Sequence, residues 1–71
     1  MKNDEIAKLQ AYLRRVFGNQ TIAVRRRAKK DDSVEVYVGE EFIGVIFKDE
    51  EEGDLSYQFQ MAILDYDLET P

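Results

Sequence analysis

Apolar side chains near the start of the chain recur at the spacing of an amphipathic helix. Between Asp4 and Phe17 they are separated by three or four residues, and charged or polar side chains occupy most positions between them. The recurring residues are Ile6, Leu9, Leu13 and Val16. This spacing predicts a helix over residues 4–17 that starts at an Asn3 or Asp4 cap and stops at Gly18.

After the helix the hydrophobic period changes to two, which is the pattern of half-buried strands. Alternation over residues 21–27 predicts one strand, and alternation over residues 34–38 predicts a second. We interpret the polar stretch Lys29–Ser33 between them as a hairpin loop. The register that best matches side chains across this hairpin pairs Val24 with Val36, Ile22 with Val38 and Arg25 with Glu35.

A third strand is predicted over Phe42–Phe47, after the dipeptide Gly39-Glu40. Glycine at the first position of a two-residue loop suits a type II′ hairpin turn. Counting outward from that turn fixes the register, because the side-chain period of a strand is two. The expected pairs are Val36 with Ile43, Glu35 with Gly44, Val34 with Val45 and Tyr37 with Phe42.

The acidic stretch 48–54 reads as a loop, and a fourth alternating run follows it from Leu55 to Ile63. We interpret this run as the last strand. Its end stays open at this point, because residues 61–68 fit either a continued strand or a short helix. We expect Glu69, Thr70 and Pro71 to be frayed.

Together these elements predict one α+β domain over residues 1–71, with the N-terminal helix on one face of a four-stranded antiparallel meander. The face under the helix would carry Val34, Val36, Ile43, Val45, Phe47, Tyr57 and Phe59. The opposite, open face would carry Arg25, Arg27, Glu35, Tyr37, Phe42, Ile46, Gln58, Gln60 and Leu64. One helix covers only one face, so we expect contact with a partner on the open face.

Length and composition agree with a single small core. A chain of 71 residues leaves no room for a second domain, and 44% hydrophobic residues are enough for it to fold. Cysteine is absent, so neither a disulfide nor thiolate-bound zinc stabilises the core. The charged N-terminal segment is unlike a signal peptide and no apolar run approaches a bilayer span, so we expect a cytoplasmic protein.

The net charge of -5 conceals a strong asymmetry. Residues 1–30 hold nine of the ten Lys and Arg residues against two acids, whereas residues 31–71 hold one Lys against thirteen acids. Such a division is more typical of a partner surface, or of attraction within or between chains, than of catalysis.

The residue types that most catalytic and binding motifs need are missing. There is no His or Cys, and neither Ser33 nor Ser56 stands in a nucleophile-elbow context. The four glycines are dispersed, so no phosphate-binding loop is formed, and the acidic run 49–54 lacks the spacing of an EF-hand. We therefore predict a protein that is not an enzyme and has no cofactor or metal; the enzymatic alternative is a carboxylate site formed between subunits.

Two surface features suggest binding. Arg25, Arg27, Lys29 and Lys30 lie in a basic cluster that could hold phosphates, with Tyr37 and Phe42 stacking bases, so a small RNA-binding protein is one reading. A charge-protected strand edge, partly neutralised by nearby acids, is the plainer reading of the same cluster, and we favour it. Arg26 should point to the core side and pair with an acid there.

The second feature is an apolar strip on the open face, formed by Tyr37, Phe42, Ile46, Ala62 and Leu64. Exposed apolar patches seldom persist on monomers, so a protein partner or self-association would cover the strip unless the C-terminal segment does. We favour a non-catalytic interaction module, with Tyr37, Phe42 and Ile46 as apolar anchors and Arg25 and Arg27 at the rim.

The segments 34–69 and 13–18 together resemble a known family. The first reads VEVYVGEEFIGVIFKDEEEGDLSYQFQMAILDYDLE and the second LRRVFG. They resemble the uncharacterised bacterial family called domain of unknown function 3126, over nearly the whole chain. The resemblance implies a short bacterial protein with one compact domain. It provides no functional residues, because such proteins have no established activity.

Overall fold

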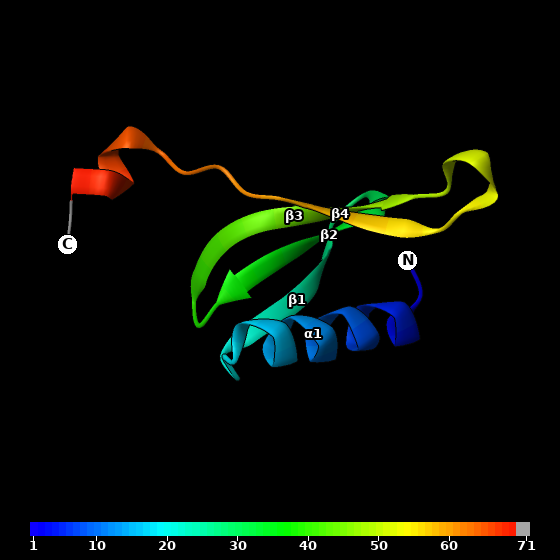
Figure 1. Ribbon diagram of the computed structural model, residues 1–71, viewed down its shortest axis with the longest axis horizontal. Helices are drawn as coiled ribbons and strands as arrows, with labels where there is room; N and C mark the ends of the chain where they lie inside the picture. Colours follow the sequence, from blue (N-terminus) through cyan, green and yellow to red (C-terminus); the bar gives the residue numbers. More distant parts are fainter. Residues whose placement is uncertain (70–71) are drawn as a thin grey trace.

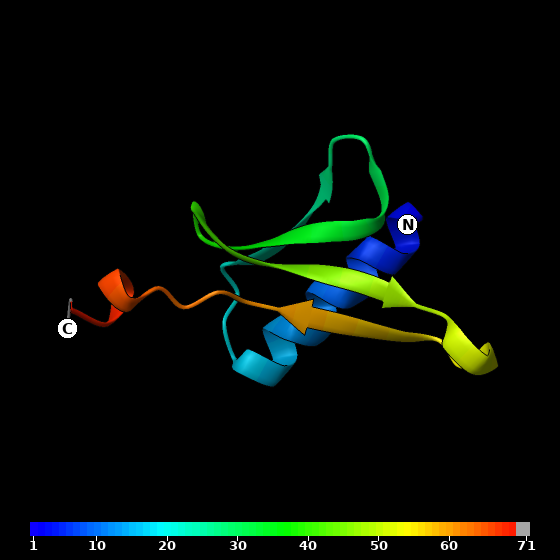
Figure 2. The same cartoon turned by 90° about the horizontal axis from the view of Figure 1, so that it is seen from above.

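A helix and a four-stranded antiparallel sheet form two layers in the computed structural model, which describes residues 1–69 apart from the side chain of Glu52 (Figures 1 and 2). The strand order β1-β2-β3-β4 follows the sequence, which confirms the predicted meander. The elements are α1 (Asn3–Phe17), β1 (Ile22–Arg27), β2 (Lys30–Val38), β3 (Glu41–Asp49), the 3-10 turn η1 (Glu51–Gly53), β4 (Ser56–Gln60) and the 3-10 helix η2 (Asp65–Glu69).

The helix ends as predicted but begins one residue earlier. Gly18 takes a left-handed conformation, with φ 60°, and its amide together with that of Asn19 bonds the last helical carbonyls. The prediction of an Asn3 or Asp4 cap is wrong, since both residues lie inside the helix and Lys2 precedes it. Instead, the Glu5 carboxylate reaches back and accepts the Lys2 backbone amide at 2.9 Å.

The register of the first hairpin is confirmed. Val24 lies opposite Val36, Ile22 opposite Val38, and Arg25 opposite Glu35. The loop is much shorter than predicted, because β2 begins at Lys30 and only two residues join the strands. Lys29 makes this tight turn with φ 64°, and a bulge between Arg26 and Arg27 shifts the end of the ladder.

The predicted register of the second hairpin is wrong beyond the pair of Tyr37 with Phe42. Tyr37 does lie opposite Phe42, but the ladder then shifts, and Val36 pairs with Gly44 instead of Ile43. A bulge at this point adds one residue to β3, so every later side chain of that strand exchanges faces. The remaining shifted pairs are Glu35 with Val45, Val34 with Ile46 and Ser33 with Phe47.

The fourth strand is shorter than predicted and the chain then leaves the sheet. β4 ends at Gln60, residues 61–64 have no regular structure, and η2 follows. The helical alternative therefore applies only to 65–69. Residues 61–69, which we call the C-terminal arm, extend past the end of the sheet, as Figures 1 and 2 show. Glu69, which we expected to be frayed, is the last residue of η2, and the expected fraying at Thr70 and Pro71 lies outside the described residues.

The core lies between α1 and the inner face of the sheet. Its buried apolar residues are Leu13, Ile22, Val24, Val34, Val36 and Ile46. Met1, Ile6, Leu9, Val38, Ile43, Tyr57 and Phe59 pack around them and stay partly exposed. Val45 and Phe47 are not part of this core, contrary to the prediction, because the bulge turns them to the outer face. The outer face is the sheet surface that α1 does not cover.

Candidate functional site

A cluster of an arginine and two aromatic rings lies on the outer face of the sheet. The guanidinium carbon of Arg25 lies 4.5 Å from the ring centre of Tyr37. Tyr37 and Phe42 are cross-strand partners whose ring centres lie 5.7 Å apart at an interplanar angle of 69°, an edge-to-face contact. The structure therefore brings together these three sequence-predicted site residues.

The polar groups of this cluster are partnered. The Tyr37 hydroxyl donates to the Glu35 carboxylate at 2.8 Å. This bond raises the pKa of the Tyr37 hydroxyl, and burial acts in the same direction, although the Arg25 charge opposes it. Arg25 of β1 thus stacks on the Tyr37 ring of β2. The Tyr37 hydroxyl in turn binds Glu35, which lies opposite Arg25.

The prediction that Ile46 lies on the outer face is wrong. Ile46 is only 2% exposed and belongs to the core, because the bulge in β3 shifts it to the inner face. Its place beside the aromatic pair is taken by Val45 and Phe47, which lie opposite Gln60 and Gln58 of β4. Phe42 remains 51% exposed and Phe47 38% exposed. The outer face therefore has an apolar strip, but Val45 and Phe47 take the place of Ile46 in it.

The basic cluster is largely committed to contacts within the chain. Arg27 is half-buried and donates to the hydroxyl of buried Ser33 at 3.1 Å, so it does not stand free at the rim. Arg26 donates to the Met1 carbonyl at 2.7 Å and to the Asn3 amide oxygen at 2.6 Å. Arg26 thus faces the helix as predicted, but its partners are neutral groups instead of an acid. Lys29 and Lys30 are exposed at the hairpin.

The start of the C-terminal arm lies beside the aromatic strip without covering it. Phe42, Phe47, Gln60, Ala62 and Leu64 line one shallow depression of about 420 Å³, together with neighbouring residues of β3 and Asp67 of η2. Leu64 is nevertheless 60% exposed, and Phe42 keeps half of its surface open. The alternative in which the C-terminal segment covers the strip is therefore not what the structure shows.

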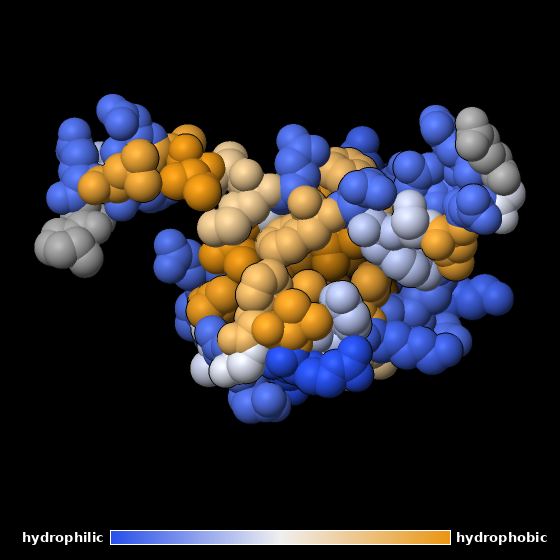
Figure 3. Space-filling view, viewed as in Figure 1, coloured by the Kyte–Doolittle hydropathy of each residue, from blue (hydrophilic) through white to orange (hydrophobic). Residues whose placement is uncertain are grey.

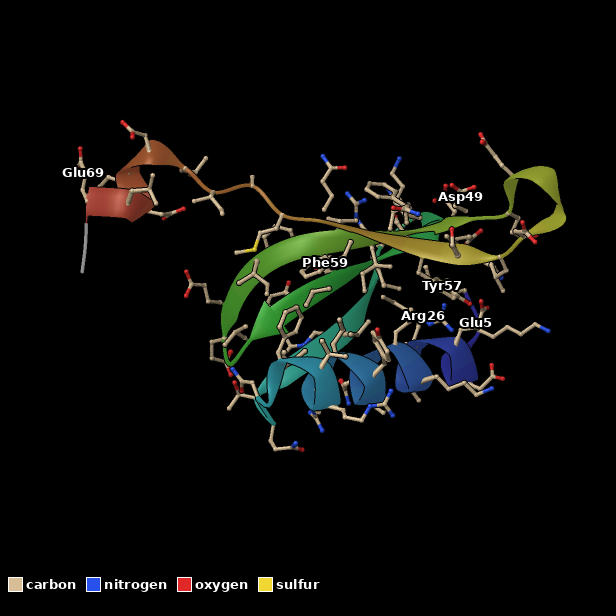
Figure 4. The ribbon with its side chains drawn as sticks, in the orientation of Figure 1. Glu5, Arg26, Asp49, Tyr57, Phe59 and Glu69 are labelled. Carbon is tan, nitrogen blue, oxygen red and sulfur yellow. The ribbon has the colours of Figure 1, made fainter. Side chains whose placement is uncertain are left out.

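A polar cluster that the sequence did not reveal joins α1 to β3 and β4. The Glu5 carboxylate accepts a bond from the Tyr57 hydroxyl at 2.7 Å and binds the Lys48 ammonium at 2.8 Å (Figure 4). Lys48 also lies 3.4 Å from Glu50. Lys48 and Tyr57 lie 43 and 52 positions after Glu5 in the sequence, and no spacing rule links such distant positions. Only the folded chain brings them together.

Hydrogen bonds set the ionisation of this cluster. The Lys2 amide, the Lys48 ammonium and the Tyr57 hydroxyl together lower the pKa of Glu5 from 4.5 to about 2. The same carboxylate raises the pKa of Lys48 and that of Tyr57. Because its groups satisfy one another, we interpret the cluster as a clamp that fixes the start of α1 against β3 and β4.

Neither cluster has the residues of a metal or nucleophilic centre. Within residues 1–69, no group of three or more His, Cys, Asp or Glu side chains is placed to hold a metal ion. No described helix is long and apolar enough to cross a membrane. The outer-face cluster offers exposed apolar rings, amides and a cation, which are groups that protein interfaces use.

Comparison with known proteins gives one match. The model of a family described as "protein of unknown function (DUF3126)" matches residues 5–67, which is most of the chain. No curated protein and no solved structure matches the chain. The matched region includes most of α1, the whole sheet and most of the C-terminal arm.

Proposed function

We propose a function from the geometry, because the chain belongs to the DUF3126 family, whose description is a protein of unknown function. The function is that of a non-catalytic interaction module whose outer sheet face binds a protein partner. The single observation that carries the proposal is the exposed aromatic strip, in which Phe42 is 51% exposed beside the Arg25–Tyr37 stack.

The composition of the strip supports a protein partner. Interfaces have an apolar, aromatic centre with polar groups around it, and aromatic and arginine side chains contribute most of their binding energy. Here Tyr37, Phe42, Val45 and Phe47 would form the centre, and Arg25 with the two glutamines of β4 would form the rim. The same proposal places the module in a bacterial cytoplasm, the setting expected from the sequence.

The RNA-binding alternative has weaker support. Arg25 already covers one face of the Tyr37 ring, and Arg26 and Arg27 bond to other groups of the chain. The cations left for phosphates are Lys29 and Lys30, on a chain whose net charge is -5. Base stacking needs an open ring face and phosphate binding needs free cations.

Capture of partners from a native lysate tests the proposal, with Phe42→Asp as the variant and Leu55→Asp as its control. Leu55 is 55% exposed and lies before β4, away from the aromatic strip, so both variants should fold. The parent chain and Leu55→Asp should retain a stoichiometric protein that resists nuclease, and Phe42→Asp should lose most of it. Equal capture by Phe42→Asp would contradict the proposal. Retention of RNA alone, released by nuclease or by salt, would favour the alternative.

A further inference from the structure

A second apolar surface lies on the opposite side of the sheet, where the helix leaves the core open. An apolar groove of about 320 Å³ runs between α1 and β4, and its lining residues are Leu9, Tyr12, Leu13, Ile46, Tyr57 and Phe59. The Glu5–Tyr57 bond closes this side near the start of the helix, and no such contact joins the later turns of α1 to β4 in the described part of the chain. Figure 3 shows the apolar surface between helix and sheet.

The C-terminal arm carries apolar side chains that have no cover of their own. Its large apolar residues are each half exposed or more: Met61, Ile63, Leu64, Tyr66 and Leu68, at 50%, 64%, 60%, 74% and 72%. Figure 3 shows apolar surface on the segment that extends beyond the main body. A chain of this size rarely exposes so contiguous an apolar segment unless another surface covers it.

The arm does not return to the groove of its own chain. Residues 61–64 read Met-Ala-Ile-Leu and contain none of the Gly, Pro, Asn, Asp or Ser residues that tight turns favour. Four extended residues span about 13 Å before Asp65. The 3-10 helix η2 that follows adds about 10 Å. The direction of β4 therefore carries the arm outward, past the end of the sheet (Figures 1 and 2).

Charge matches the arm to the groove. Arg15 stacks over the ring of Tyr12 at 5.3 Å. The depression next to the groove shares Leu9 and Tyr57 with it, and its charged lining residues are Lys2, Lys8 and Lys48 against Asp4 and Glu5, of which Glu5 is paired with Lys48. The groove is thus flanked by cations on α1. The arm carries acids instead, among them Asp65 and Glu69 on η2. The asymmetry of the sequence, basic before residue 31 and acidic after it, therefore places opposite charges on the two surfaces.

We propose that the C-terminal arm of one chain docks in the groove between α1 and β4 of a second copy, reciprocally, so that the protein is a two-fold symmetric dimer. In a two-fold arrangement each chain supplies one arm and one groove, and both apolar surfaces become covered. In this dimer the apolar side chains of the arm cover the groove at the edge of the partner's core, and the acids of the arm pair with the cations of α1.

Cysteine cross-linking between two differently marked chains tests this docking directly, because the natural sequence contains no cysteine. One chain carries Leu68→Cys in the arm and the other carries Tyr12→Cys at the groove. After mixing and oxidation, these two should form a covalent heterodimer. A mixture of Leu68→Cys with Phe42→Cys, whose cysteine lies on the outer face, is the matched control and should form several-fold less.

Sedimentation of the chain, which measures its oligomeric state, is the second test of the docking. The parent chain should be dimeric in sedimentation, and Leu68→Asp should weaken the dimer by roughly 100- to 10,000-fold, because the dimer loses one buried leucine at each of its two sites. Leu68 is 72% exposed in the single chain, so this variant should fold. A chain that is monomeric at every concentration would overturn the proposal.

A third variant, which carries Tyr12→Cys and Leu68→Cys together, distinguishes docking of the arm in another copy from docking in its own chain. If dilution gives an intrachain disulfide in place of the covalent dimer, the arm occupies its own groove and the proposal fails. This inference is independent of the proposed function: Phe42→Asp should keep the dimer and lose the outer-face partner, whereas Leu68→Asp should do the reverse.

Discussion

The two ends of the chain use their apolar residues in opposite ways. Among the described residues, every buried one lies at or before Ile46, whereas the region after it exposes Leu55 and all the large apolar residues of the arm. The first region has a helix and two hairpins that bring apolar faces together. The second has the end of β3, one short strand whose Tyr57 and Phe59 only border the core, and an arm with no layer above it. A high content of apolar residues therefore does not by itself bury them. The later region has apolar side chains like those of the core, but no second layer of the same chain packs over them.

The largest difference in stability between the two regions is expected when one isoleucine is replaced in each. Ile46→Ala should lower the free energy of unfolding by about 2–5 kcal/mol, because it leaves a cavity beneath α1. Ile63→Ala, at a position 64% exposed, should change it by less than about 0.5 kcal/mol. Urea denaturation of both variants, followed by circular dichroism at concentrations where the chain is monomeric, measures the two values.

A smaller effect concerns the clamp at the border of the two regions. The pKa of Glu5 is about 2 in the folded protein and 4.5 without its partners, so the unfolded chain binds more protons between these values. The stabilisation by Glu5 is complete above pH 4.5 and is lost as the pH falls toward 2. Glu5→Gln should be less stable than the parent at neutral pH, and this difference should shrink in that window.

Lys48→Met is the matched control for the acid titration. It keeps Glu5 but removes the cation bound at 2.8 Å, so the acid loss of stability should move to higher pH. Stability curves measured by denaturation across the pH range would show this movement. A Glu5→Gln variant that follows the parent curve at a constant offset from neutral pH to pH 2 would contradict the role given to the clamp.

Sequence periodicity was sufficient for the parts of the fold that depend on local pattern. The amphipathic spacing of α1 and the glycine at its end predicted the helix to within one residue. The alternation in β1 and β2 predicted their register, because pairing Val24 with Val36 also placed Ile22 opposite Val38 and Arg25 opposite Glu35. The pairing of Tyr37 with Phe42 followed from the turn at Gly39, which has φ 60°.

The bulge in β3 could not be read from the pattern, and it changed the candidate site. The run Phe42–Phe47 is apolar at almost every position, so its alternation does not say which residues face inward. The sign that could have revealed the bulge is Gly44. A Cβ there would lie 2.5 Å from the Gln60 carbonyl oxygen and 2.7 Å from a ring carbon of Phe59, so the strand needs glycine at this point. The bulge makes room for Ile43 and Ile46 on the inner face.

The extent of β4 and the Glu5 clamp also escaped prediction, for a different reason. Alternation continues to Ile63, yet the ladder with β3 ends at the pair Val45 with Gln60. β4 stops beside the bulge in β3, where the regular edge of β3 ends. The sequence of β4 itself does not contain this information. Lys48 and Tyr57 likewise approach Glu5 only when α1 lies across the sheet.

Amide hydrogen exchange at two protein concentrations tests most directly the claim that the arm leaves its own core to be covered by another chain. Exchange rates report the opening of each backbone segment separately. The account predicts that amides of residues 61–68 exchange almost without protection in the dilute monomer and become protected as the chain is concentrated, while β2 is protected at both concentrations. Arm amides that are equally protected in the dilute monomer would contradict it.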